Sequence, residues 1–567
     1  MRKRTIRLVA LLGSVVWLAG AQAQAQTNQQ RVPLLMSKMP PQQSVAYKAL
    51  KVVADNPTVE ALALTKSEIW SVPAENVDAV MQAATRYGVD ARPLGQRTAA
   101  AGTKGGLTRG VIPEASREPI DNWRQIFRLA PADIKMNDKQ KQLMEIAKAS
   151  RSTVEVGVMQ TQFAPVVEYA LTKDAGAQTP SDDAAKITVA LSQSTVLTIN
   201  RASVEIKPQM CIWHGRVEGT DAPATIIWWP DGKMAGSVQH QGRLYSIRHL
   251  GGEMHAVVEM SDARMPQEHA PMPARLRAND PNLRDDPLVN QGDASVLRRA
   301  TTKETKATSG ERSQAASSKK HQQLALAPTR AKEGVAKPAK DKSAAQPSDI
   351  VIDVIVAYTK KATSNYFDVR SELIDLSVEE ANESFRISGI GNVKLRLVHA
   401  YETDYVEEGA HFDHVWRFAD KGDGYMEEIH PLRDKYQADV AILIVDDPKG
   451  CGLATRVHAD ADEAFAVVHH ECAASTYSLA HEIGHIIGAR HELATDKNMA
   501  PFPYGHGYVN GQKWRDIMSY KDSCGGCRRI PVWSSPKVLI KGEPAGTAEV
   551  DNARVIAEQA ARVANFR

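Results

Sequence analysis

The fold of this chain is decided by the stretch His481-Glu482-Ile483-Gly484-His485-Ile486-Ile487-Gly488-Ala489-Arg490-His491. Two histidines four positions apart on a helix lie on one face, so both imidazoles can bind one metal ion. Glu482 follows the first histidine and can hold a metal-bound water as a general base. Because Gly488 has no Cβ, the chain can leave the helix in a left-handed turn that returns His491 as a third ligand. Three imidazole nitrogens and a water form the open tetrahedral arrangement of a catalytic zinc site.

The residues around this stretch support a buried helix. Ser475 and Thr476 predict an N-cap for a helix that begins there. Apolar residues at helical spacing predict the face that turns toward the core, namely Leu479, Ile483, Ile486 and Ile487. The alternative is a buried helix whose histidines only hydrogen-bond to each other. Gly488 and His491 together make a chance match on the order of one in ten thousand, which favours the zinc site.

Motifs downstream of the histidines resemble those of the metzincin metallopeptidases. Met518, in Asp516-Ile517-Met518-Ser519-Tyr520, matches the methionine turn below the zinc site of that clan. Within the clan, the chain is similar to bacterial reprolysin-like enzymes and especially to peptidyl-Asp metalloendopeptidases, over about residues 350–567. Further matching segments are Pro501–Tyr508, Arg529–Pro536 and Asp551–Ile556. Glu492 departs from the reprolysins, which carry Asp after the third histidine where astacins carry Glu.

This resemblance implies an α/β fold, with a metzincin catalytic domain built from a twisted mixed sheet and a zinc-site helix. It implies a zinc-dependent endopeptidase with one catalytic ion, protein or peptide substrates, and Glu482 as the general base. The implied metal ligands are His481, His485 and His491. Tyr520 is either a donor to the transition-state oxyanion, as in astacins and serralysins, or only structural. Calcium binding is left open.

Substrate binding is expected at an exposed strand edge, where an extended peptide is held by main-chain hydrogen bonds. On the fold of the clan, the candidate for that edge is the segment Gly452–Val468. If the resemblance extends to specificity, cleavage falls on the amino side of Asp or Glu. An acidic preference needs a cation in the substrate pocket, and Arg528 and Arg529 lie beyond the methionine turn, where that wall is expected. Solvation at the surface is the alternative for both arginines.

Five cysteines in an exported chain predict disulfides and leave one cysteine over. Cys451 and Cys472 flank the candidate edge and are predicted to pair. Cys524 and Cys527 form a C-x-x-C motif, which without a thioredoxin-like βαβ context favours a local disulfide over a redox site. Cys211 is then a zinc-binding cysteine switch, an inert buried thiol or the partner in an intermolecular bond.

The N-terminus carries the features of a secretory signal peptide. Arg2, Lys3, Arg4 and Arg7 form a basic head, and an apolar run of about fourteen residues follows it up to the small-residue cleavage sites near Ala25. That run is too short for a comfortable membrane span. The sequence therefore predicts a secreted protein, extracellular or periplasmic, without stable membrane insertion after the signal is removed.

Composition changes along the chain predict its domains. Residues from about 150 to 262 are rich in β-branched and aromatic residues and are predicted as strands, with a hairpin at Asp231-Gly232 and a small sheet closed by Leu244–Arg248. The segment from 265 to 348 is rich in Lys, Ala and Ser and shows no apolar period, which predicts a disordered linker. The predicted layout is a signal peptide at 1–25, an inhibitory α+β propeptide with a β-rich second half at 26–264, this linker, and a catalytic domain at 349–567.

The overall charge narrows the classes of function. The net charge of +3 on 567 residues argues against nucleic acid as the main partner. A zymogen restrained by its own propeptide agrees with a broad protease that is exported. Two alternatives stay open: a secreted binding or adhesion module with a structural metal site, and a zinc amidase that acts on cell-wall peptides. Glu482 counts against the first, because a structural site has no use for a base.

Overall fold

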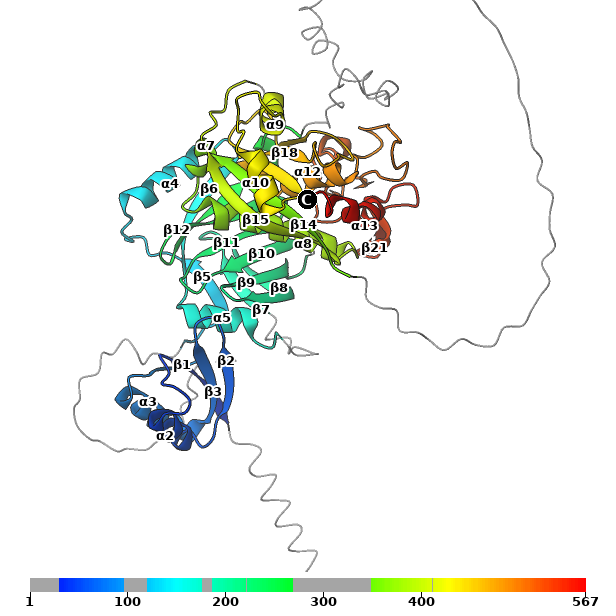
Figure 1. Ribbon diagram of the computed structural model, residues 1–567. Coiled ribbons are helices and arrows are strands. Elements are labelled where there is room, and N and C mark those ends of the chain that lie inside the picture. Colours follow the sequence, from blue (N-terminus) through cyan, green and yellow to red (C-terminus); the bar gives the residue numbers. More distant parts are fainter. Residues whose placement is uncertain (1–29, 96–119, 176–185, 221, 269–347, 410) are drawn as a thin grey trace, which may run out of the picture. The chain divides into compact units, whose positions relative to one another are not determined.

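The computed structural model describes residues 30–95, 120–175, 186–220, 222–268, 348–409 and 411–567 (Figure 1). The described residues before Pro271 and those from Ile350 onward belong to one unit. The predicted signal peptide lies outside the described residues, and so does the predicted linker except for Met265–Glu268 and Ser348. None of the helices in the described part is both long and apolar enough to cross a membrane.

The first part of the chain is an antiparallel sheet covered by two helices. The strand order is β2-β3-β1-β4. Helix α2 begins after Ser44, whose side chain accepts a hydrogen bond from the Tyr47 amide and so satisfies one of the free N–H groups of the first turn. The strands are β1 (Arg31–Ser37), β2 (Thr58–Leu62), β3 (Ser67–Pro73) and β4 (Asp90–Pro93), and the helices are α2 (Val45–Val53) and α3 (Val77–Arg86).

A closed β-barrel follows, in the order β10-β11-β12-β13-β6-β5-β7-β8-β9. Closure removes the free edges that a small sheet would leave, so the small sheet predicted from the sequence is part of a larger structure. Trp213 and Trp228 are fully buried in its core. The elements are β5 (Gln125–Leu129), α4 (Asp138–Ala149), β6 (Thr153–Thr161), α5 (Ala164–Thr172), β7 (Lys186–Ala190), β8 (Val196–Lys207), β9 (Met210–Val217), β10 (Pro223–Trp228), β11 (Met234–His240), β12 (Arg243–Gly251) and β13 (Met254–Met260).

The C-terminal region is a mixed α/β structure, as predicted. Its sheet has the order β15-β14-β16-β18-β17, with parallel pairing except between β17 and β18, which are antiparallel. β16 is buried along its whole length, which explains its unbroken apolar sequence VAILIV. The strands are β14 (Ile350–Thr359), β15 (Val393–Thr403), β16 (Val440–Val445), β17 (Gly452–Ala454) and β18 (Phe465–His469). The sheet therefore ends at β17, inside the segment predicted as the substrate-binding edge.

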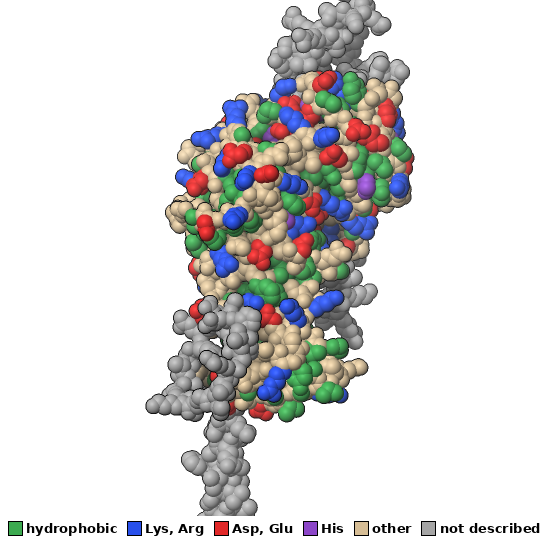
Figure 2. Space-filling view, turned by 90° about the vertical axis from the view of Figure 1, so that its left-hand side faces the viewer, with side chains coloured by type: hydrophobic (Ala, Val, Ile, Leu, Met, Phe, Trp, Pro, Cys, Tyr) green, Lys and Arg blue, Asp and Glu red, His purple; other side chains and the backbone are tan. Residues whose placement is uncertain are grey.

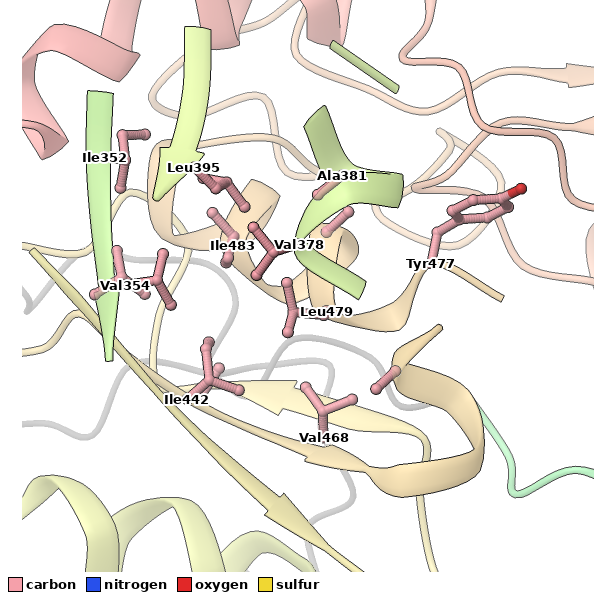
Figure 3. Close-up of a cluster of buried hydrophobic side chains, with 14 of the residues drawn as sticks. Ile352, Val354, Val378, Ala381, Leu395, Ile442, Val468, Tyr477, Leu479 and Ile483 are labelled. Carbon is pink, nitrogen blue, oxygen red and sulfur yellow. The ribbon is translucent and has the colours of Figure 1, made fainter. Parts of the chain in front are cut away.

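Helix α12 (Ser478–Ile487) packs between this sheet and neighbouring helices. Figure 3 shows Leu479 and Ile483 of α12 among Val354 of β14, Ile442 of β16 and Val378 of α8, as the apolar spacing predicted. The other elements of the region are α7 (Lys360–Thr363), a π-helix (Arg370–Asp375), α8 (Leu376–Ile387), α9 (His411–Ala419), α10 (Ile429–Tyr436), α11 (His470–Ala473), β19 (Val509–Asn510), β20 (Trp514–Arg515), β21 (Ser535–Ile540), β22 (Glu543–Ala545) and α13 (Asn552–Val563).

The N-cap predicted for α12 is wrong. The helix begins at Ser478, and its N-cap is Tyr477, which makes no side-chain cap hydrogen bond. The Thr476 hydroxyl donates instead to the Cys472 carbonyl, 2.6 Å away. Ser475 and Tyr477 both have positive φ angles, 62° and 61°. The Ser475 amide donates to Glu380 over 2.8 Å and the Thr476 carbonyl accepts from Arg529 over 2.9 Å, so distant residues set the entry into the helix.

The cysteines pair as predicted. Cys451 is bonded to Cys472 and Cys524 to Cys527. Cys211, on β9, is free and fully buried in the barrel core, so it does not contact the histidines. Burial raises the pKa of its thiol to about 12, which keeps it protonated at neutral pH. Of the three roles considered for Cys211, the structure favours the inert buried thiol.

The barrel and the C-terminal region share contacts within their unit. Ile212 of β9 and Ile227 of β10 belong to the same apolar cluster as the core around α12. The Lys207 ammonium lies 2.6 Å from the Glu379 carboxylate of α8. On the face drawn in Figure 2, basic and acidic side chains are interspersed, in keeping with the small net charge.

Candidate active site

Three buried histidines point their Nε2 atoms at one another. His481 and His485 lie on successive turns of α12, and His491 returns after Gly488, whose φ is 136°. The Nε2 atom of His485 lies 3.1 Å from that of His481 and 3.0 Å from that of His491, and the third separation is 3.1 Å. All three side chains are at most 4% exposed. The structure thus brings together the three ligands predicted from the sequence.

The hydrogen bonds on the far side of two rings fix their tautomers. His481 Nδ1 lies 2.8 Å from the Ile517 carbonyl, and His485 Nδ1 lies 2.9 Å from the Ala489 carbonyl. A carbonyl only accepts, so each Nδ1 carries the proton and each Nε2 presents a lone pair. Burial lowers the pKa of all three histidines, which keeps them neutral. Converging lone pairs repel unless a cation lies between them, so these residues fit a tetrahedral zinc ion.

Glu482 lies under the edge strand β17. Its carboxylate accepts a hydrogen bond from the Ala454 amide. A Cβ added to Gly452 would come within 2.4 Å of Glu482 Oε1, so glycine is what lets the edge strand approach this close. Burial raises the pKa of Glu482 to about 8, and the hydrogen bond from Ala454 opposes that rise. Any cation bound by the histidines would oppose it further.

Met518 and Tyr520 complete the floor and one wall of the site. A Cβ on Gly484 would lie 3.1 Å from Met518 Sδ, so the methionine lies against the histidine helix. The centroids of the Tyr520 and His491 rings are 4.3 Å apart. The Tyr520 hydroxyl is buried and has no hydrogen-bond partner among the described residues. Burial raises the pKa of this phenol far above its usual value, so it remains a donor.

Glu492, the departure from the reprolysin pattern, ties the third histidine to the Tyr520 segment. Its Oε2 accepts a 3.1 Å hydrogen bond from the Tyr520 amide. Its Oε1 accepts from the Thr495 hydroxyl at 2.5 Å and from the Ser523 hydroxyl. The longer glutamate side chain therefore positions the backbone that carries Tyr520.

Two buried arginines lie beside the histidines. The main chain of Arg515 pairs with the segment around Arg529. The Arg515 carbonyl accepts a 2.9 Å hydrogen bond from the Ile530 amide, and the Arg515 amide donates a 2.9 Å hydrogen bond to the Arg528 carbonyl. These two bonds place Arg515 next to Arg529. Arg515 and Arg529 are 1% and 5% exposed, so surface solvation is the wrong interpretation for Arg529. Burial lowers the pKa of His481, and the neighbouring His485 ring and the charge of Arg529 add to the effect. Arg528 is only half-buried.

Sequence reasoning missed Arg515. It lies three positions before Met518, just outside the segment Asp516–Tyr520 that resembles the methionine turn. The available signal was weak: Arg515 lies between Trp514 and Asp516, two positions before the apolar pair Ile517-Met518.

A second cluster of metal-ligand types has a different explanation. Asp446, His469 and His470 place one ligand atom each within 4.8 Å of one another. His469 Nδ1 accepts a hydrogen bond from the Glu471 amide, so in the neutral ring the proton is on Nε2, which faces Asp446 at 3.7 Å. The Lys361 ammonium donates to the Asp446 carbonyl and adds positive charge. These contacts account for the arrangement of the three side chains, and we assign the cluster no metal role.

The fold and this site define a metallopeptidase, and comparison with known proteins gives the family. The family model for metallo-peptidase family M12, of the reprolysin type, matches residues 348–534. A peptidyl-Asp metalloendopeptidase of Xanthomonas campestris pv. campestris is 31% identical over 409 residues, which cover 70% of this chain and 84% of that protein. A second, from Stenotrophomonas maltophilia, is 32% identical over 387 residues, 65% of this chain and 80% of the relative.

The chain therefore belongs to the M12 metallopeptidases, in the group of the peptidyl-Asp metalloendopeptidases. It is an enzyme, a zinc metalloendopeptidase, as the sequence predicted. Membership of this family sets aside the alternative of an adhesion module with a structural metal. The zinc amidase alternative has no support from these relatives.

Proposed function

We propose that this chain is a secreted zymogen of a zinc endopeptidase that cuts on the amino side of Asp or Glu. One observation carries the catalytic part: three neutral Nε2 atoms converge beside Glu482, directly under the open edge of the sheet. His481, His485 and His491 would hold the zinc ion. When bound, zinc acts as a Lewis acid that activates a water and polarises the scissile carbonyl.

The protein's own groups supply the proton transfers and the binding. The Glu482 carboxylate takes a proton from the attacking water and then delivers it to the leaving amine. The free side of β17 holds the substrate backbone in an extended conformation. Burial of Glu482 excludes bulk water and makes each electrostatic interaction at the reacting carbonyl stronger.

Tyr520 is proposed as a hydrogen-bond donor to the oxyanion that forms on the scissile carbonyl. We expect Tyr520→Phe to lower kcat on the order of 10²-fold, with little change in KM. Since the hydroxyl has no partner among the described residues, its removal should leave the melting temperature unchanged. Steady-state kinetics and thermal unfolding check both statements.

Tyr401→Phe is the matched control for this variant. Its hydroxyl, on β15, is also buried without a described partner, but it lies outside the site. An unchanged kcat in Tyr520→Phe would assign Tyr520 a structural role.

The acidic preference is proposed from Arg529, which places a positive charge next to the site, and from the name that the relatives carry. The test uses two fluorogenic peptides that differ only in one Asp or Asn residue. Wild type freed of its N-terminal region should prefer the Asp peptide. Arg529→Gln should lose most of this preference, because its kcat/KM should fall for the Asp peptide and stay unchanged for the Asn peptide. Buried charge pairs make a loss of about 30-fold or more reasonable.

Lys537→Gln, an exposed charge change on β21, is the control and should keep the preference. Equal cleavage of both peptides by wild type would contradict the acidic specificity while leaving the endopeptidase activity in place. Secretion and a removable N-terminal region complete the proposal. The signal-like N-terminus supports the first, and the barrel, which has a buried core cluster of its own, supports the second.

A further inference from the structure

The segment that leaves the barrel, Asp262–Glu268, ends against the arginine pair. The Glu268 carboxylate contacts Nη2 of Arg529 directly and lies 3.4 Å from Nη2 of Arg515. It also accepts a 3.0 Å hydrogen bond from the Lys521 amide. The Glu268 side chain is 12% exposed, and both arginines are more deeply buried. Charged hydrogen bonds shielded from water in this way are strong.

The carboxylates paired with these arginines come from the N-terminal region. Asp262 Oδ2 lies 3.3 Å from Arg515 Nη2, and Glu268 contacts both arginines. Within the part of the chain that the structure describes, the C-terminal region contributes no carboxylate to either guanidinium. The guanidiniums also donate to the main-chain carbonyls of Thr476, Ser519 and Cys527, which are neutral acceptors. A buried charge without a counterion is costly. Once the N-terminal region is gone, Arg515 and Arg529 form a site for an acidic side chain from elsewhere.

The backbone of the same segment follows the start of the edge strand. The Gln267 carbonyl accepts a 2.9 Å hydrogen bond from the Cys451 amide, and Met265 and Pro266 are buried. Cys451 precedes Gly452, the residue that lies against Glu482. A main-chain bond to an edge strand together with a side chain in a pocket is how an extended peptide is recognised.

The arrangement also explains why this segment would not be cut in place. If Glu268 were the acidic residue of a substrate, the carbonyl to be attacked would be that of Gln267. That carbonyl is held by the Cys451 amide instead. Glu268 and Asp262 already contact the Nη2 atoms of Arg529 and Arg515, which are the groups that an acidic side chain of a substrate would need.

We propose that Glu268 is a built-in inhibitor, which occupies the acidic-side-chain subsite formed by Arg515, Arg529 and the Lys521 amide and keeps the uncleaved chain inactive. This inference rests on the proposed acidic specificity. Removal of the barrel region then uncovers a subsite that takes the Asp or Glu side chain of a protein substrate. Glu268 inhibits the peptidase by binding as a substrate side chain would, and Cys211 takes no part in this inhibition.

The test compares uncleaved full-length wild type with Glu268→Gln on the fluorogenic Asp peptide, with the state of the chain followed by gel electrophoresis. Glu268→Gln should hydrolyse the peptide faster than wild type by about tenfold or more, because an amide loses the charge that holds the arginines. Glu205→Gln, at an exposed position on β8, is the matched control and should behave as wild type.

A second measurement does not depend on how the variant folds. A synthetic peptide with the sequence of residues 262–268 is added to wild type freed of its N-terminal region. It should inhibit hydrolysis competitively, and its version with Gln in place of the final Glu should inhibit more weakly by about tenfold or more.

The outcomes separate the two proposals. If the freed enzyme prefers the Asp peptide but neither the Glu268→Gln chain nor the peptide pair shows the expected difference, the inhibitor role is overturned and the acidic specificity stands. If the freed enzyme cuts Asp and Asn peptides equally, the specificity itself fails, and the subsite with it.

Discussion

Glu482→Gln should abolish peptide hydrolysis while the protein keeps its zinc. Glutamine has nearly the same shape and can still accept the hydrogen bond from the Ala454 amide, so the packing under β17 is preserved. It has no basic oxygen to take the proton of the attacking water. General base catalysis contributes about 10²–10⁴-fold, so kcat should fall by at least that range. Hydrolysis of a denatured protein and zinc content per chain are the measurements, both after removal of the N-terminal region.

Glu558→Gln is the control for this variant, because it makes the same chemical change at an exposed position of α13. It should retain full activity and full zinc content. A Glu482→Gln protein that holds zinc and hydrolyses peptides at the wild-type rate would remove Glu482 from the mechanism.

His491→Ala should lose both zinc and activity. This histidine is the ligand that the chain returns to the site after Gly488, and its Nε2 lies 3.0 and 3.1 Å from those of the two helical histidines. Two ligands on one helix face leave half of the coordination sphere to solvent. Mutation of residues that only hydrogen-bond to metal ligands lowers metal affinity by about 10–100-fold, so loss of a direct ligand should lower it further.

Zinc binding by this variant can also be measured without a substrate, from the melting temperature. Because the three lone pairs converge, zinc should stabilise the wild-type fold, and chelation should lower its melting temperature. In His491→Ala the chelator should have little further effect. His399→Ala, on β15 and away from the site, is the control and should keep zinc. Full zinc content in His491→Ala would mean that the metal is held in some other way.

The α/β character of the C-terminal region was predicted from the sequence, whereas the barrel was predicted only as strands that form a small sheet. This difference has a physical reason. The strand Ile350–Thr359 and the helix Ser478–Ile487 carry strong apolar patterns, and local patterns of this kind predict an element almost by themselves. The barrel strands carry the pattern as well, which is why strands were expected there. Whether those strands close on themselves depends on pairings between residues far apart, such as β5 with β7 and β13 with β6, and no local pattern encodes these.

The sequence by itself determined the histidine site, because its chemistry is local. His481 and His485 are four positions apart on one helix face, Gly488 permits the turn, and His491 follows within one short segment. The two disulfides were also predicted from sequence, one of them between cysteines only three positions apart. Residues this close in the sequence stay close in space in any fold in which the helix forms.

Only the tertiary structure decided what surrounds that site. Arg515 and Arg529 become neighbours through a backbone bridge, and Glu268 reaches Arg515 across 247 positions of sequence. A charged residue in a sequence shows neither its burial nor its partner, because both depend on how distant segments pack. The entry into α12 was missed for the same reason: contacts from Glu380 and Arg529 outweigh the local capping preference of Ser475 and Thr476.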